Sequence, residues 1–150
     1  MRLTQFSDYS LRLLLYLSQH QDRSVTIAEV ADWYGVSKAH LVKVAHRLVR
    51  RGYIASTRGK GGGLRLGKPA EAINIADLVR DTEPDFHTVE CFDRARGTCR
   101  ITQICTLKHV LHGATDAFFS VLGRHSLADI ANPIISQDNM KRRSSHDNPL

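Results

Sequence analysis

Residues 26–66 read TIAEVADWYGVSKAHLVKVAHRLVRRGYIASTRGKGGGLRL, and their pattern decides the fold class. Apolar residues recur at helical spacing up to Gly35 and resume after Ser37, which predicts two helices joined by a short turn. Thr26 and Glu29 have the spacing of a capping box at the start of the first helix. Two helices joined by a short turn that contains glycine form a helix-turn-helix pattern.

The second helix, expected over residues 38–51, has an apolar side and a basic side. Its inward stripe at i, i+3, i+4 and i+7 consists of Leu41, Val44, Ala45 and Leu48. Its candidate DNA-contacting residues are Lys38, His40, Lys43, Arg47 and Arg50. Residues 33–70 contain no Asp or Glu, but they contain nine of the 21 Lys and Arg residues. This excess indicates a phosphate-binding surface, although a merely solvated basic face has the same composition.

Two short strands are expected on either side of a glycine-rich loop, at residues 53–57 and 63–66. The glycines of this loop allow the backbone to approach a surface closely, and Arg58 and Lys60 add positive charge. A nucleotide-binding loop is the rival interpretation, but neither G-x-x-x-x-G-K-[ST] nor G-x-G-x-x-G is present, and no helix follows. The pattern therefore predicts a β-hairpin wing attached to the helix-turn-helix.

Further helices are expected on both sides of this stretch. Residues 4–20 are apolar nearly all round, which predicts burial on more than one side, including against a partner subunit. Residues 75–82 form a helix that stops before a proline, and residues 126–131 form another short one. Residues 106–123 carry a wide apolar stripe, which indicates a long dimerisation helix. The expected fold class is mainly α with a small β-hairpin wing, followed by a polar, disordered tail over residues 132–150.

The chain has three cysteines, Cys91, Cys99 and Cys105, spaced C-x7-C-x5-C. An odd number excludes complete pairing as disulfides within one chain. No apolar run approaches the ~18 residues of a membrane span, and the N-terminus is polar where a secretion signal is apolar. We therefore expect a cytoplasmic protein, in which clustered cysteines bind metals or act in redox chemistry. Three thiols suit a soft metal or cluster whose fourth ligand comes from elsewhere.

Two alternatives for the cysteines remain open. A structural zinc site usually contains a C-x2–4-C pair, which is absent here. Reactive thiols that form disulfides under stress are the second alternative, because Arg94, Arg96 and Arg100 favour thiolates. No Ser/His/Asp constellation and no paired carboxylates suggest catalysis, so the chain is not expected to be an enzyme.

Several stretches carry a resemblance to a known family. They read MRLTQFSDYSLRLLLYL, YGVSKAHLVKV, RGKGGGLRLGKPA, INIADLVRDTEP, CTLKHVL and SLADI, and they are spread over residues 1–131. Together they resemble the winged-helix iron–sulfur regulators, the family that contains IscR, and within it the NsrR group of nitric-oxide-sensing repressors. A wing followed by three cysteines before a helix is a specific combination, whereas a helix-turn-helix alone is not.

The resemblance implies a homodimer with one iron–sulfur cluster per subunit, held by Cys91, Cys99 and Cys105. IscR-type members have a histidine three positions after the last cysteine, where this chain has Lys108. In some NsrR-type proteins an aspartate in the first helix of the partner subunit is the fourth ligand, and Asp8 matches that position. The resemblance leaves both this ligand and the cluster type, [2Fe–2S] or [4Fe–4S], open.

The expected organisation has four parts. Residues 1–84 form the winged helix-turn-helix region, 85–105 the cluster-binding loop, 106–131 the dimerisation helix with a short C-terminal helix, and 132–150 the tail. The resemblance implies a repressor that binds palindromic double-stranded operator DNA and releases it when nitric oxide reaches the cluster. The alternatives are a sensor of redox state or cluster supply on the same fold, and a thiol-based redox switch.

Overall fold

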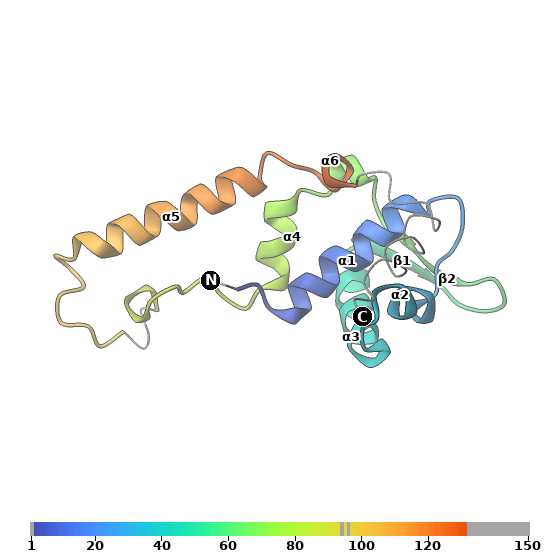
Figure 1. The fold of residues 1–150 in the computed structure, drawn as a ribbon, viewed down its shortest axis with the longest axis horizontal. Coiled ribbons are helices and arrows are strands. Elements are labelled where there is room, and N and C mark those ends of the chain that lie inside the picture. Colours follow the sequence, from blue (N-terminus) through green and yellow to red (C-terminus); the bar gives the residue numbers. More distant parts are fainter. Residues whose placement is uncertain (1, 94, 96, 132–150) are drawn as a thin grey trace, which may run out of the picture.

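A computed structural model describes residues 2–93, 95 and 97–131, and it confirms a mainly helical fold with a two-stranded antiparallel sheet. The elements in chain order are α1 (Gln5–Gln19), α2 (Ile27–Tyr34), α3 (Lys38–Arg50), β1 (Ile54–Thr57), β2 (Gly63–Leu66), the 3-10 turn η1 (Ala70–Ala72), α4 (Ile75–Thr82), the 3-10 turn η2 (Glu90–Phe92), α5 (Thr106–Leu122) and α6 (Leu127–Ile130). We call α1–α4, the hairpin and α6 the head. Figure 1 shows α5 extending away from the head, with the hairpin at the opposite end. The expected tail, residues 132–150, lies outside the described residues.

Most helices begin at a residue whose side chain accepts a hydrogen bond from a backbone N–H of the first turn. Such a bond satisfies a donor that has no partner within the helix. These N-cap residues are Thr4, Thr26, Ser37, Asn74 and Ser126. At the end of α2, Gly35 adopts the left-handed conformation with φ 62°, which a residue with a Cβ rarely tolerates. The helix boundaries predicted from local sequence therefore agree with the structure to within about two residues.

The predicted capping box of α2 forms only in part. Thr26 accepts from the Glu29 N–H, as expected, but the Glu29 carboxylate pairs with Arg23 and accepts from the Tyr16 hydroxyl at 2.9 Å. The hydrogen bond from Arg23 is the main reason that the pKa of Glu29 is lowered to about 2. Burial, followed by the bond to Glu29, raises the pKa of Tyr16 to about 12. Glu29 therefore joins α1 to α2 instead of closing its own helix end.

The wing is attached to the segment before α2 by a contact that the local sequence did not predict. Val25, in the segment before α2, forms a β-bridge with Leu64 of β2, with N···O distances of 3.0 and 2.8 Å. Gly63 lies so close to this segment that a Cβ on it would be 2.8 Å from the Val25 carbonyl oxygen. Arg65 adds a hydrogen bond to the Ser24 hydroxyl at 3.1 Å. Strand β2 is therefore fixed to the segment before α2, at the start of the helix-turn-helix.

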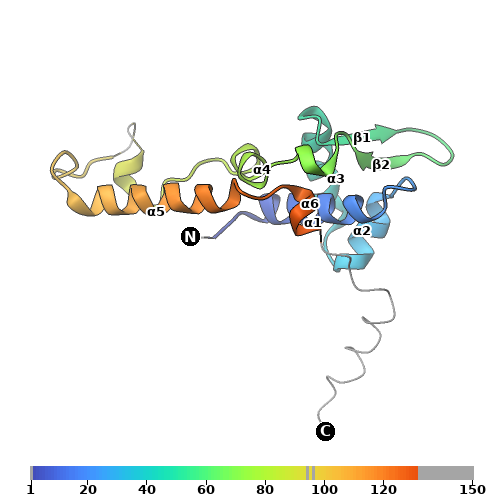
Figure 2. The same ribbon diagram turned by 90° about the horizontal axis from the view of Figure 1, so that it is seen from above.

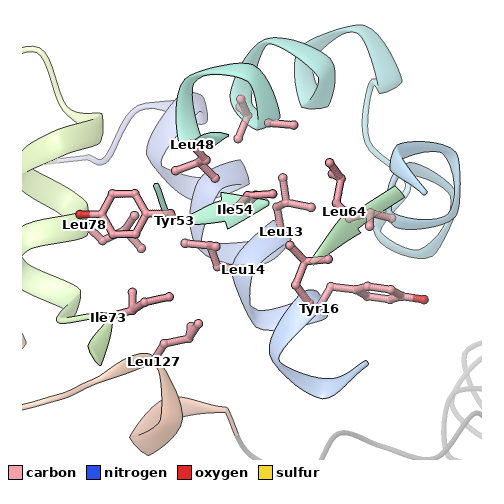
Figure 3. Packing of buried hydrophobic residues seen from close by; sticks show 14 of the residues in the cluster. Leu13, Leu14, Tyr16, Leu48, Tyr53, Ile54, Leu64, Ile73, Leu78 and Leu127 are labelled. Atoms are coloured by element: carbon pink, nitrogen blue, oxygen red, sulfur yellow. The ribbon is translucent and has the colours of Figure 1, made fainter. Parts of the chain in front are cut away.

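The core is built around α1. Figure 3 shows Leu13 and Leu14 of α1 between the hairpin residues Ile54 and Leu64 on one side and Leu127 of α6 on the other. Leu11 and Leu15 are half-buried and also pack against the core. The burial of α1 on several sides, expected partly from a partner subunit, is thus largely provided by its own chain.

Helix α5 has no buried residue, in contrast to the helices of the head. Its C-terminal end contacts α4 and the segment that follows α4: the Phe119 ring packs beneath the Arg80 guanidinium and edge-on against Phe86. The chain then returns to the core: the Leu127 N–H donates to the Ile73 carbonyl at 2.8 Å, and Leu127 is fully buried. The other end of α5 projects away from the head (Figure 2).

The Glu29 contacts predict a specific pH dependence. A carboxylate whose pKa lies below its unfolded value of about 4.3 stabilises the fold at higher pH, and this contribution is lost as the pH falls towards the folded value. Glu29→Gln is expected to lower the unfolding free energy by about 1 kcal/mol at pH 7, a modest amount because the pair is partly exposed. Denaturant unfolding should show this difference shrinking between about pH 4.5 and pH 3.

Glu71→Gln is the matched control, since Glu71 is exposed on η1. It should change neither the stability at pH 7 nor its pH dependence appreciably. A difference between Glu29→Gln and the parent protein that stays constant down to about pH 3 would contradict the prediction.

Candidate DNA-binding face and cysteine loop

All five candidate DNA-contacting residues expected on α3 are exposed. The buried side of the helix consists of Leu41, Val44, Ala45 and Leu48. At 3.6 residues per turn, the residues two positions earlier lie about 200° away on the helix surface. These outermost positions, again at i, i+3, i+4 and i+7, are Ala39, Val42, Lys43 and His46, which are all exposed. Sequence reasoning overlooked Ala39 and Val42 as members of this face, although the repeated spacing marks them.

Two of the expected DNA-contacting residues lie on the flank of α3 that faces α1. The His40 ring is 6.2 Å from the Tyr9 ring, and the Arg47 guanidinium lies 5.3 Å above the Phe6 ring. Arg47 also donates a hydrogen bond to the Asp81 carbonyl oxygen at 3.1 Å. In the free protein, Arg47 is therefore engaged with α1 and α4, whereas Lys43 lies on the outermost stripe.

Asp81, near the end of α4, holds the C-terminal end of α3 and the start of the wing. Its carboxylate accepts from Arg51 at 2.9 Å and from the Tyr53 hydroxyl at 2.7 Å. Burial, followed by the bond to Asp81, raises the pKa of Tyr53. Sequence reasoning missed this role because the partners are 28 and 30 positions apart and have no local pattern.

The tip of the wing is built from glycines in conformations that other residues rarely adopt. Gly59 and Gly61 have φ angles of 99° and 80°, and a Cβ on Gly62 would be 2.3 Å from the Thr57 carbonyl oxygen. Arg58 and Lys60 alternate with these glycines and are exposed. Both views place the tip at the end of the head farthest from α5 (Figures 1 and 2).

The cysteine loop is closed at its neck by Glu90 and Thr98. The Glu90 carboxylate accepts from the Thr98 N–H at 2.9 Å and from its hydroxyl at 2.8 Å. These bonds lower the pKa of Glu90. Because Glu90 precedes Cys91 and Thr98 precedes Cys99, the neck brings these two cysteines to the same part of the loop. Cys91 and Cys99 line one hollow of about 310 Å³.

Cys105 stands apart from that hollow, at the N-cap of α5, and its side chain forms no capping hydrogen bond. All three cysteines are free thiols. Within residues 2–93, 95 and 97–131, no three His, Cys, Asp or Glu side chains are grouped closely enough to hold a metal ion. The donor chemistry nevertheless fits a soft metal, because cysteine sulfur is a ligand that soft metals prefer and two of the thiols line one hollow. Of the three arginines expected beside the cysteines, Arg100 lines that hollow, and Arg94 and Arg96 lie outside the described residues.

Asp8 lies in the first turn of α1. Figures 1 and 2 place α1 in the head, whereas the loop before α5 runs from the end of α4 out to the far end of α5. Both carboxylate oxygens of Asp8 bind Arg12, with Oδ1···Nε and Oδ2···Nη2 distances of 2.9 Å. The i, i+4 order of acid and base marks this pair in the sequence, but sequence reasoning missed it. Within its own chain, Asp8 is thus engaged in an ion pair with Arg12.

The described residues contain no helix long and apolar enough to cross a membrane.

Comparison with known proteins gives one family, and the relatives that follow are also transcriptional regulators. Residues 3–133 match the sequence profile of Rrf2, described as an iron-dependent transcriptional regulator. The HTH-type transcriptional regulator NsrR of Bacillus licheniformis is 44% identical over 143 residues, which cover 95% of this chain and 98% of that protein. The protein of the same name in Bacillus subtilis strain 168 is 46% identical over 131 residues, with coverages of 87% and 90%.

Solved structures support the same fold. The chain matches CymR (YrzC), the global cysteine regulator of B. subtilis, with a TM-score of 0.72 at 23% identity, over 87% of this chain and 96% of that one. It matches IscR of T. potens with a TM-score of 0.71 at 20% identity, and the match covers 100% of this chain and 93% of that one. At these identities the likeness concerns the fold alone. The resemblance to NsrR predicted from the sequence is confirmed by the curated relatives.

The contacts of Asp81 generate a prediction about stability. Tyr53→Phe removes one hydrogen bond to a carboxylate and leaves the ring in place, so it is expected to lower the unfolding free energy by about 1 to 2 kcal/mol. Denaturant unfolding measures this change. Tyr34→Phe is the matched control, because no hydrogen bond of the Tyr34 hydroxyl is present within the described residues and its ring is half-buried. Equal losses in the two variants would contradict the role assigned to Asp81.

Proposed function

Because the chain belongs to the Rrf2 family of transcriptional regulators, we propose that it is a dimeric repressor that senses nitric oxide through an iron–sulfur cluster. The family places it among DNA-binding regulators and not among enzymes. The observation that carries the proposal is the combination of NsrR relatives at 42–46% identity with three free thiols in the loop after the head. Its parts are argued in turn below.

The DNA-binding part of the proposal rests on the charge of α3 and the wing. Helix α3 lies in the major groove, with contacts from Lys38, His40, Lys43, Arg47 and Arg50. Arg58 and Lys60 of the wing lie along phosphates or in the adjacent minor groove. Binding of this kind releases counterions, so affinity falls steeply with salt. Two-fold symmetry of a dimer predicts a roughly palindromic operator with half-sites about one helical turn apart, or a multiple of it.

The homodimer is supported by the exposed apolar side of α5. Leu107 and Val110 are each 62% exposed, and Val121 is 53% exposed. Exposed apolar surface of this kind marks an interface, and a second copy of the same helix covers it in a symmetric dimer. The projecting shape of α5 allows its far end to reach the partner's head (Figure 2).

The cluster is held in this proposal by Cys91, Cys99, Cys105 and Asp8 of the partner subunit. When bound, the cluster supplies iron that reacts with nitric oxide. Asp8 then has two alternative partners: the cluster in the intact dimer, and Arg12 of its own helix once the cluster is lost. This exchange changes the contacts of α1, against which α3 packs. An effect on DNA binding requires that the two states differ in operator affinity. Three thiolates and one carboxylate suit either a [2Fe–2S] or a [4Fe–4S] cluster.

A thiol-based redox switch is a second candidate, favoured by one observation. Cys91 and Cys99 are free and line the same hollow, so oxidation could join them without a metal. A sensor of redox state or cluster supply is the third candidate. Lys108 counts against an IscR-like ligand set, because it lines the hollow at the position of the expected histidine.

The decisive experiment is anaerobic purification of the full chain, followed by iron and sulfide analysis and a visible absorption spectrum. Operator binding and the spectrum are then followed together during titration with nitric oxide. The expected result is a brown protein whose spectrum changes at stoichiometric nitric oxide and which releases DNA over the same range. Equal DNA affinity before and after nitrosylation would contradict sensing. A colourless protein that releases DNA only on thiol oxidation would favour the thiol switch.

The neck of the cysteine loop provides a test of the cluster site itself. Glu90→Ala removes both bonds to Thr98, and so allows Cys91 and Cys99 to move apart. We expect the variant to lose iron to a chelator several-fold faster than the parent, which absorbance at the cluster bands measures. Glu71→Ala changes an exposed glutamate on η1, outside the cysteine loop, so it serves as the control and should retain the parent's rate. Unchanged iron loss in Glu90→Ala would show that the neck does not organise the cluster ligands.

A further inference from the structure

Val42 is an apolar side chain exposed in the middle of a basic surface. Among the described residues, the exposed large apolar side chains are Val42, Ile101, Ile104, Leu107, Val110 and Val121. All except Val42 belong to the cysteine loop or to α5. Val42 is 46% exposed on α3, within the stretch of residues 33–70 that has no acidic residue. We propose that Val42 contacts the methyl group of a thymine in the operator, and this inference rests on the DNA-binding function proposed above.

The position of Val42 on α3 supports this assignment. Ala39, Val42, Lys43 and His46 form the stripe opposite the buried side of the helix, so they are the residues nearest to anything that α3 approaches. Ala39 precedes Val42 by one turn and is small, which allows the helix backbone to come close at that point. Val42 therefore projects beyond its apolar neighbour on the same stripe.

The charge around Val42 identifies the kind of surface that it meets. Lys38 and Lys43 lie close to it on the exposed part of α3, and Arg50 extends the same side. A basic surface attracts a polyanion, which argues against an apolar protein partner and for nucleic acid. In the major groove of DNA, the C5 methyl of thymine is the apolar group that the base edges present, and apolar side chains recognise it.

The chemistry of valine suits such a contact. A β-branched side chain in a helix has essentially one χ1 rotamer, so little conformational entropy is lost when it is fixed against a base. Burial of one methyl group contributes about 0.8 kcal/mol, which corresponds to about 4-fold in affinity for each half-site. The contact therefore discriminates one base pair without supplying much of the total affinity.

The test begins with selection of operator sequences from random double-stranded DNA by the full-length wild-type protein. Each thymine of the selected sequence is then replaced singly by deoxyuridine, which removes only the methyl group. Wild-type protein should lose about 4-fold in affinity at one thymine in each half-site. Val42→Ala should bind the thymine and uracil forms of that position equally, because the contact is already absent.

Lys43→Ala is the matched control, since Lys43 is the neighbour of Val42 on the outward stripe. It should weaken binding to both forms of the operator and keep the 4-fold ratio between them. Circular dichroism melting should show that Val42→Ala folds like the parent, as expected for an exposed position. The inference would be overturned if Val42→Ala still lost affinity when that thymine is replaced by deoxyuridine. It would also be overturned if wild-type protein lost no affinity at any thymine. Either result would leave the proposed DNA-binding function standing. Failure to select any DNA sequence would overturn the proposed DNA-binding function as well.

Discussion

Leu13, Leu14 and Leu17 of α1 are at most 1% exposed, and α3, α4, α6 and β2 all pack against this helix. Full burial of one leucine side chain contributes about 1.5–3 kcal/mol, so these three positions supply a large share of a marginal net stability. Helix α3, the wing and α4 are positioned relative to one another because all of them pack against α1. A displacement of α1 would therefore change the packing of all three.

Three consecutive residues at the end of α4 connect the cysteine loop to the rest of the head. Asp81 binds Arg51 and Tyr53 at the end of α3 and the start of the wing. The Thr82 hydroxyl accepts from the Ser7 hydroxyl at 2.8 Å in a buried contact, and Glu83 accepts from the Thr4 N–H at 2.7 Å. The loop thus begins at a point attached both to the candidate DNA-binding face and to the turn of α1 that carries Asp8. This arrangement gives the proposed sensor a continuous set of contacts between its two functional parts.

Local sequence was sufficient for most of the secondary structure. Thr4, Ser37 and Asn74 cap helices whose starts agree with the expected ranges, and the glycines of the wing lie where the backbone turns. The predictions failed where a side chain binds residues outside its own helix. Glu29 has the spacing of a capping box, but its carboxylate binds Arg23 and Tyr16 because the packing of α1 on α2 brings these groups within reach.

The sequence by itself determined the order of the elements, the basic character of α3 and the wing, and the presence of three thiols between the head and the last long helix. These properties depend on helical periodicity, capping and turn chemistry, which act within about four residues. Only the tertiary structure decided that the Arg47 guanidinium packs on Phe6 of α1 and that Cys91 and Cys99 share a hollow. Such choices depend on which faces of separate helices meet, and that is set by the packing of the whole core.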